Sequence, residues 1–278
     1  MRIAVGEFSF DVRETGPADG RPVLLLHGFP QTSRSWDAVA TRLAASGYRC
    51  LAPDQRGYSP SARPVGVAAY RMDAIVADAV GILDALGLDQ VDVVGHDWGA
   101  NVGWLLASWH PDRVRTLTAV SVPHPKAYGW AMRHDPEQQQ KGSYIKLFLL
   151  EGKAEDALLA EDARRFRRMF AGGSLAEDAI EHYVTTLSEP GALTAALNWY
   201  RAAFDGVRRG PDLEPLSVPT TYVWSSGDAA LARSGAERSG EYVAADYRFV
   251  ELDGISHWIP EQAPDVLTEA ILDRLALG

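Results

Sequence analysis

The chain has 278 residues, of which 46% are hydrophobic and 23% are charged. These proportions are close to globular averages, so they exclude a disordered tail, a collagen and a disulfide scaffold. The formal net charge is −10, from 27 Lys and Arg against 37 Asp and Glu. Because such a field repels phosphate backbones and anionic lipids, nucleic acids and membrane surfaces are poor candidate partners. The length allows one α/β domain that carries an inserted lid.

Cysteine content and the apolar runs indicate the compartment. Cys50 is the only cysteine, which excludes an intrachain disulfide and fits a reducing environment. We interpret it as a small buried hydrophobic residue in a strand. The N-terminal segment has no apolar run long enough for a signal peptide, and none elsewhere approaches the ~20 residues of a membrane span. We therefore expect a cytoplasmic protein.

Strands and helices alternate through the first 121 residues. Alternating apolar residues at 8–12 predict a half-buried strand, and the continuous run from Val23 to Leu26 predicts a strand buried on both faces. Periodicity and breakers predict helices at 34–46, 72–86 and 99–110, and strands at 48–52, 91–94 and 114–121. This alternation is typical of a parallel sheet with helices on both faces.

The pattern changes after residue 123. As far as about residue 211 no clear buried strand is indicated, and segments such as 164–170 and 192–204 have helical patterns. Strands are again predicted at 220–224 and 247–252, before a closing helix at 266–275. We therefore divide the chain into a first core part, a helical cap and a second core part, at residues 1–123, 124–210 and 211–278.

The most informative segment is Gly95-His96-Asp97-Trp98-Gly99, which joins a buried strand to a helix. In the Gly-x-Ser-x-Gly form of this turn, the central residue is a nucleophile on a sharp strand-to-helix bend. The glycines are needed because a side chain at either flank would clash. Asp97 occupies the nucleophile position. The alternative interpretation is that Asp97 only caps the following helix.

Two later segments complete a catalytic pattern. Asp228 lies in the polar turn after the predicted strand 220–224, and His257 follows the strand 247–252. An aspartate in that place would orient the histidine and stabilise its charged form. The chain order of nucleophile, acid and histidine is that of α/β-hydrolases. The loop from His27 to Pro30 follows the first buried strand, where an oxyanion-hole loop is expected, and Pro30 is a candidate for a cis peptide bond.

Together these motifs resemble the epoxide hydrolase branch of the α/β-hydrolase superfamily, which it shares with haloalkane dehalogenases. The segments that carry the resemblance are 27–30, 54–59, 95–99, 196–201, 224–228 and 254–258. The resemblance implies an α/β-hydrolase fold, with a mostly parallel central sheet flanked by helices and an inserted helical cap. It also implies an oxyanion hole formed by the backbone N–H groups of Phe29 and Trp98.

The type of nucleophile constrains the substrate. A carboxylate that attacks an ester would form a high-energy anhydride, whereas attack on a saturated carbon gives an ordinary ester that water can cleave. Asp97 therefore favours epoxides or alkyl halides, and we expect a small neutral organic substrate and water as partners. His257, held by Asp228, would activate that water. No Walker loop, dinucleotide signature or metal-ligand spacing is found, so no cofactor or metal is implied.

The leaving group separates the two chemistries. An epoxide oxygen needs proton donors, and the resemblance implies two tyrosines of the cap. Tyr200, in Asn198-Trp199-Tyr200-Arg201, matches the first, and we assign the second to Tyr144. In a shifted register the second position falls on Leu147, which can donate nothing, and Tyr128 is a weaker candidate.

The first alternative is a haloalkane dehalogenase that uses the same Asp97. It would need two N–H donors for the halide. The Trp98 indole offers one, the Phe29 side chain offers none, and nothing in the sequence places Trp130 or Trp199 at a halide. The second alternative is a ligand-binding relative without turnover, which would have no need of the complete catalytic set. We therefore predict hydrolysis of epoxides to vicinal diols by a covalent ester on Asp97. A homodimer is compatible with the sequence.

Overall fold

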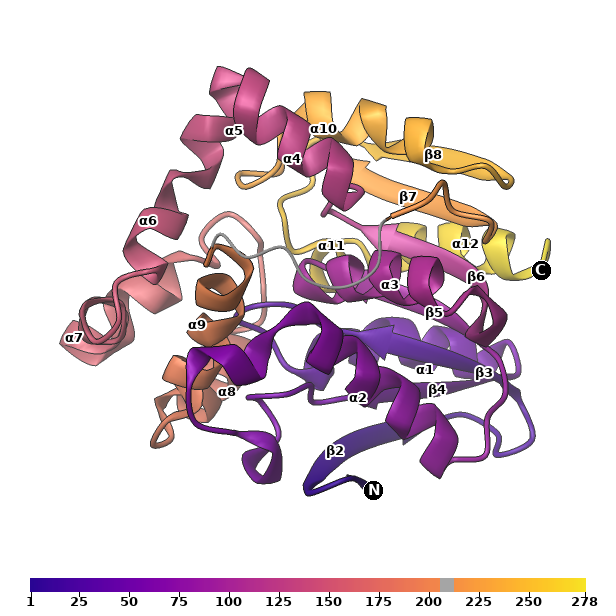
Figure 1. Cartoon of the computed structure of the whole chain (residues 1–278), viewed down its shortest axis with the longest axis horizontal. Coiled ribbons are helices and arrows are strands. Elements are labelled where there is room, and N and C mark those ends of the chain that lie inside the picture. Colours follow the sequence, from indigo (N-terminus) through magenta and orange to yellow (C-terminus); the bar gives the residue numbers. More distant parts are fainter. Residues whose placement is uncertain (206–212) are drawn as a thin grey trace.

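A sheet of eight strands forms the centre of the computed structural model, which describes residues 1–205 and 213–278 (Figure 1). The strand order is β1-β2-β4-β3-β5-β6-β7-β8. The first two strands pair antiparallel, and β4, β3, β5, β6, β7 and β8 run parallel to one another. The strands are β1 Arg2–Val5, β2 Phe8–Thr15, β3 Arg21–Leu26, β4 Tyr48–Pro53, β5 Val91–His96, β6 Val114–Val120, β7 Thr220–Ser225 and β8 Tyr247–Leu252.

Helices cover both faces of the sheet. Along β3, Leu24 and Leu26 belong to the hydrophobic cluster on the side of α2 and α3, whereas Val23 and Leu25 belong to the cluster on the side of α1 and α12. This alternation follows from the two-residue period of a strand, and burial on both faces explains its continuous apolar run. The covering helices are α1 Asp37–Ala45, α2 Met72–Ala85, α3 Trp98–Trp109 and α12 Pro264–Leu275.

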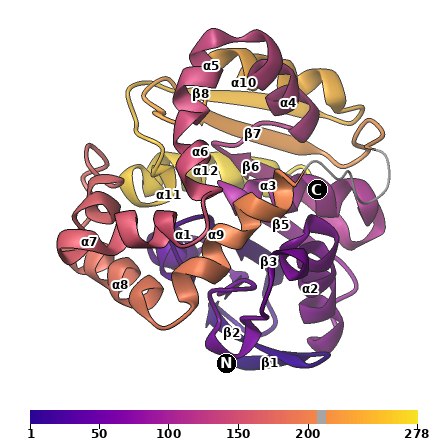
Figure 2. The same ribbon diagram turned by 60° about the vertical axis from the view of Figure 1, so that its left-hand side comes forward.

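Among the described residues, six α-helices lie between β6 and β7 in the chain. Figures 1 and 2 show them gathered beyond one end of the strands, apart from the helices that cover the sheet. The border expected at 210/211 lies outside the described residues, and α4 begins next to the border expected at 123/124. These helices are α4 Pro125–His134, α5 Pro136–Lys141, α6 Ile145–Phe148, α7 Lys153–Arg168, α8 Glu177–Ser188 and α9 Ala192–Ala203.

Most predicted elements are present, with shifts of a few residues at their ends. The predicted helix 34–46 begins instead as a 3₁₀ turn, because the Thr32 hydroxyl accepts the Arg34 N–H and caps that turn first. The N-terminal strand β1 was not predicted. In the described part of the chain, no helix is both long and apolar enough to cross a membrane. The remaining short elements are η1 Ser33–Trp36, η2 Pro60–Ala62, η3 Val67–Tyr70, η4 Pro111–Arg113, η5 Gly142–Tyr144, α10 Arg233–Arg238, η6 Ser239–Tyr242 and α11 Ile259–Gln262.

Candidate active site

Asp97 lies on a strained turn between β5 and α3. Its backbone has φ 53° and ψ −121°, a positive φ that non-glycine residues rarely adopt. The Asp97 side chain makes no capping hydrogen bond to α3, so a helix cap does not explain it. A Cβ atom on Gly95 would lie 2.1 Å from the carbonyl oxygen of Gly99, and one on Gly99 would lie 2.0 Å from that of Leu26. The two glycines therefore let the turn press against β3, which keeps the Asp97 carboxylate at the end of the sheet.

The loop after β3 holds the Asp97 carboxylate. The backbone N–H of Phe29 donates to Asp97 Oδ1 at 2.7 Å. A Cβ on Gly28 would lie 2.2 Å from the same oxygen, so only glycine permits this approach. His27 fixes the loop, as the backbone N–H of Gln55 donates to its Nε2 at 3.1 Å. The Phe29–Pro30 peptide bond is cis, which agrees with the candidate named from the sequence.

His257 lies between two carboxylates. Its Nδ1 donates to Asp228 Oδ2 at 2.8 Å, and its Nε2 lies 3.4 Å from Asp97 Oδ2. The other oxygen of Asp228 accepts the backbone N–H groups of Ala230 at 2.7 Å and Leu231 at 3.0 Å. Two turns that are far apart in the sequence are thus locked together beside the nucleophile.

The charges of this group depend on one another. Burial lowers the pKa of His257, but the charge of Asp228, its hydrogen bond and then Asp97 outweigh burial and raise that pKa to about 10. Burial likewise opposes ionisation of Asp228, but the charge and hydrogen bond of His257 hold its pKa below the usual value. With both carboxylates ionised, His257 is therefore an imidazolium.

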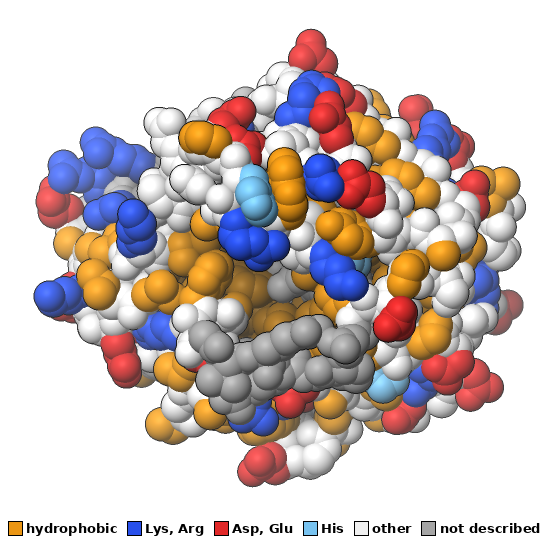
Figure 3. Space-filling view, turned by 45° about the horizontal axis from the view of Figure 1, so that its top comes forward, with side chains coloured by type: hydrophobic (Ala, Val, Ile, Leu, Met, Phe, Trp, Pro, Cys, Tyr) orange, Lys and Arg blue, Asp and Glu red, His pale blue; other side chains and the backbone are white. Residues whose placement is uncertain are grey.

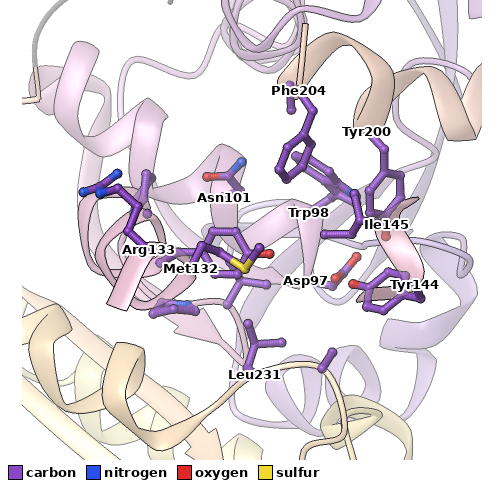
Figure 4. A pocket seen from close by; sticks show the side chains of 17 residues that line it. Asp97, Trp98, Asn101, Met132, Arg133, Tyr144, Ile145, Tyr200, Phe204 and Leu231 are labelled. Carbon is purple, nitrogen blue, oxygen red and sulfur yellow. The ribbon is translucent and has the colours of Figure 1, made fainter. Parts of the chain in front are cut away.

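Tyr144 and Tyr200 face Asp97 across a cavity. Tyr200 comes from α9, and its ring lies 4.9 Å from the Trp98 ring and 5.5 Å from the Phe29 ring. Tyr144 ends η5, and its ring lies 6.4 Å from that of Tyr200. Figure 4 shows both tyrosines beside Asp97. Burial raises the pKa of both phenols well above the usual value, so both hydroxyls keep their protons and are donors.

Two cavities meet at Asp97. One has a volume of about 360 Å³ and the other about 260 Å³, and Asp97, Tyr144 and Tyr200 line both. Most of the remaining lining side chains are hydrophobic, and Figure 3 shows a hollow with a hydrophobic floor. Leu147, the residue of the shifted register, lines only the smaller cavity, and Tyr128 lines only the larger. Tyr144 is therefore the second tyrosine that reaches the junction.

The tryptophans considered for a halide site have other contacts. The indole N–H of Trp199 donates to the carbonyl oxygen of Arg56 at 2.9 Å. The Trp130 ring stacks on His134 at 5.0 Å. Trp130 is not among the described residues that line these two cavities. Neither indole is therefore placed to bind a halide beside Asp97.

Sequence reasoning missed how the polar residues behind His257 are connected. His96 Nε2 lies 2.8 Å from the backbone carbonyl oxygen of His257, and His96 Nδ1 lies 3.1 Å from Gln31 Oε1. Gln31 in turn is hydrogen-bonded to Glu261, four residues after His257. The one available signal was that these polar residues adjoin the catalytic motifs, which does not reveal that they touch each other.

Comparisons with known proteins agree with this geometry. A sequence model of the α/β hydrolase fold family matches residues 21–264. The chain is 32% identical to epoxide hydrolase A of Mycobacterium tuberculosis, over 95% of this chain and 93% of that protein. It is 34% identical to the AB hydrolase superfamily protein YfhM of Bacillus subtilis, with the same two coverages.

A solved structure of an epoxide hydrolase from Bacillus megaterium superposes with a TM-score of 0.90 at 26% identity, covering 99% of this chain and all of that one. That structure holds the enzyme's product, a naphthyloxy-propane-1,2-diol. The chain belongs to the α/β-hydrolase superfamily, in its epoxide hydrolase branch.

Proposed function

We propose that this protein hydrolyses epoxides to vicinal diols. The observation that carries the proposal is the arrangement around the cavity, where a carboxylate nucleophile with its base faces two tyrosine hydroxyls. A nucleophile, an activated water and donors for the leaving oxygen are the three components that this reaction needs. The epoxide hydrolases among its relatives support the same reaction.

In the first step, Asp97 opens the ring. Its Oδ1 is held by the Phe29 N–H, so Oδ2 attacks one epoxide carbon and an alkyl ester forms. The C–O bond of the ring breaks, and its electron pair goes to the epoxide oxygen. Tyr200 and Tyr144 donate hydrogen bonds to that oxygen, which lowers the barrier to its departure, and one of them transfers its proton to it and becomes a phenolate.

In the second step, His257 activates water. Formation of the ester removes the negative charge of Asp97, so one of the two charges that raise the pKa of His257 is lost. The proton of His257 passes through solvent to the phenolate left by the first step, and the neutral imidazole accepts a proton from water while Asp228 keeps the ring oriented. The hydroxide so formed attacks the carboxyl carbon of Asp97 in the ester, and the resulting oxyanion lies between the N–H groups of Phe29 and Trp98. On collapse the bond from this carbon to the alkyl oxygen breaks, and that oxygen takes the proton of the carboxyl group. The diol is released with Asp97 ionised and His257 protonated again.

Residues 124–210 act in this proposal as a cap that brings the tyrosines and the apolar walls to the core. The hydrophobic lining of both cavities supports a small neutral organic epoxide as substrate. The thiol of Cys50 is buried, and burial raises its pKa to about 12, so it is unreactive. Residence in the cytoplasm stays a prediction. A homodimer stays a prediction.

The test is to trap the ester. In His257→Gln the first step remains and the second lacks its base, so incubation with styrene oxide should increase the intact mass by that of one epoxide. Peptide mapping should place the addition on Asp97. The matched control, Asp97→Asn with His257→Gln, should gain nothing. Absence of any adduct in the single variant would rule out the proposed mechanism. Release of bromide from bromoalkanes, with no diol from epoxides, would instead indicate a dehalogenase.

A further inference from the structure

A chain of polar side chains connects the backbone of His257 to the helices between β6 and β7. His96, at the end of β5, contacts the His257 carbonyl oxygen through Nε2 and Gln31 Oε1 through Nδ1. The other end of the Gln31 amide, Nε2, lies at hydrogen-bonding distance from Glu261 Oε2 in α11. Glu261 Oε1 accepts the hydroxyl of Tyr183, in α8, at 2.9 Å. His96 and Gln31 have no exposed surface, so their hydrogen bonds must be satisfied within this chain of contacts.

The protons of this chain can be assigned by following donors and acceptors. A carbonyl oxygen only accepts, so His96 Nε2 must carry a hydrogen to bond to His257. A neutral imidazole has one N–H, so His96 Nδ1 must then accept, and the Gln31 NH₂ group must donate to it. The structure places Gln31 Oε1 at His96 and Gln31 Nε2 at Glu261. The oxygen and nitrogen of an amide are distinguished by their partners alone, so the amide can be turned by 180° to meet this requirement. The Gln31 oxygen then faces Glu261 Oε2. Two oxygens at hydrogen-bonding distance require a proton between them, which Glu261 must carry.

Ionisation of Glu261 breaks the hydrogen bond from His96 to the His257 carbonyl. If Glu261 is ionised, the Gln31 amide stays as the structure places it, so Gln31 Nε2 donates to Glu261 and Gln31 Oε1 accepts a hydrogen from His96 Nδ1. Neutral His96 then presents a lone pair to the His257 carbonyl at 2.8 Å. Only an imidazolium would restore that bond. Burial and then the charge of His257 lower the pKa of His96 to about 4, against the effects of Asp97 and Asp228. His96 is therefore neutral near pH 7, and the bond to the His257 carbonyl is not restored.

Glu261 can hold the proton. Burial raises its pKa to about 7, although the hydrogen bonds from Tyr183 and Gln31 and the charge of Arg34 act in the opposite direction. The other titratable groups on the elements packed around it are Asp37 of α1, which raises the pKa, His182 of α8, which contacts Thr32, and Asp265 of α12, which pairs with Arg42.

We propose that Glu261 is a positioning residue that works in its protonated form, and that its ionisation removes the hydrogen bond from His96 to the His257 carbonyl. The Ser121 hydroxyl also donates to that carbonyl, at a longer 3.3 Å. The loop that carries His257 therefore keeps one hydrogen bond at this carbonyl when the bond from His96 is lost. Turnover then falls as pH rises through the pKa of Glu261, because the base is less well placed. The effect on turnover rests on the proposed function, whereas the proton on Glu261 does not.

The decisive variant is Glu261→Gln. Its amide nitrogen donates to the Gln31 oxygen and its amide oxygen accepts from Tyr183, so it imitates the protonated carboxyl without being able to ionise. We expect the wild-type kcat to fall with an apparent pKa near 7 and the variant to show no such fall. Glu261→Leu should lower kcat roughly tenfold at every pH, with little effect on KM. Glu269→Gln, an exposed change on α12, makes the same change of charge and should keep the wild-type profile.

A measurement without substrate tests the proton itself. The infrared band of a protonated carboxylic acid should be present in the wild type at pH 6, disappear as the pH rises through about 7, and be absent in Glu261→Gln. A wild-type band already lost at pH 5, or an unaltered kcat profile in Glu261→Gln, would overturn the proposal. If the band titrates as expected but no epoxide is turned over, the proposed function fails and the proton assignment stands.

The pH dependence of the melting temperature also tests the raised pKa of Glu261, because the direction of the change is fixed. The raised pKa of Glu261 means that its contribution is complete below the ordinary value of 4.5 and is lost as pH rises through about 7. The melting temperature of Glu261→Gln relative to wild type should therefore increase between these limits and level off above them. A difference that stays constant with pH would contradict a native pKa near 7.

Discussion

The two sides of the cavity differ in what they contribute. The sheet side supplies the charged groups of the catalytic set, Asp97, Asp228 and His257, each on a turn that follows a strand and each tied to a backbone or charged partner. The helices between β6 and β7 supply Tyr144 and Tyr200, which are neutral, and mostly hydrophobic walls, to which Arg133 adds a cation in the larger cavity and Arg165 one in the smaller. The catalytic charges are thus placed where strand ends and backbone N–H groups can compensate them. The apolar side can vary in shape without disturbing that compensation.

Directional contacts join the two sides. Among them, the Trp199 indole donates to the Arg56 carbonyl oxygen, the Tyr183 hydroxyl donates to Glu261, and Lys141 Nζ donates to the Asp228 carbonyl oxygen. Arg201 pairs with Glu155 within the helical part, where both side chains are largely buried. The alignment of the tyrosines with Asp97 therefore depends on specific hydrogen bonds as well as on burial of hydrophobic area.

The largest effect is expected when the hydroxyls of the two cap tyrosines are removed and the charged groups of the sheet side are left in place. Tyr144→Phe and Tyr200→Phe should each lower kcat for epoxides about 10- to 100-fold, and the double variant should lower it about a thousandfold. The ring packing is kept, so KM should change little. Steady-state kinetics on styrene oxide measure these effects.

Tyr128→Phe is the matched control for the tyrosines, because its ring lines only the larger cavity. It should leave kcat near the wild-type value. If Tyr128→Phe lost as much activity as Tyr144→Phe, the assignment of the second donor would be wrong.

A change on the sheet side should affect stability more than chemistry. Arg56 forms two hydrogen bonds of 2.6 Å with Asp78, and both side chains are about nine-tenths buried. Asp78→Asn leaves the guanidinium without its counter-charge, which should lower the free energy of unfolding by about 3 kcal/mol. Denaturant titration measures the loss. Arg248→Ala breaks an exposed pair with Asp273 and should cost less than about 1 kcal/mol. Equal losses would show that burial of the Arg56 pair does not matter.

The smallest effect is expected where the two sides meet. Trp199→Phe keeps an aromatic ring but removes the donor to the Arg56 carbonyl, which leaves a buried acceptor without this bond. The free energy of unfolding should fall by about 1 kcal/mol, and KM should rise more than kcat falls. An unaltered KM with unaltered stability would show that this contact does not align the two sides.

The sequence alone was sufficient for the architecture and for the charged groups of the candidate site. The run Val23 to Leu26 and the turn around Asp97 have local signatures, because a doubly buried strand needs continuous apolar residues and a sharp turn needs glycine. Asp228 and His257 could be found because the carboxyl ends of parallel strands lie at one edge of a sheet. Their proximity therefore follows from topology.

Only the tertiary structure decided which cap residues meet Asp97 and how the polar residues behind His257 are connected. The residue pattern favoured Tyr144 but did not settle whether Tyr144, Leu147 or Tyr128 stands at the second donor position, since a helix can turn any face towards a cavity until its packing is known. The link from Glu261 through Gln31 to His96 joins segments far apart in the chain, and no local pattern records it. The protons along it follow from distances between atoms, so a list of residues could not supply them.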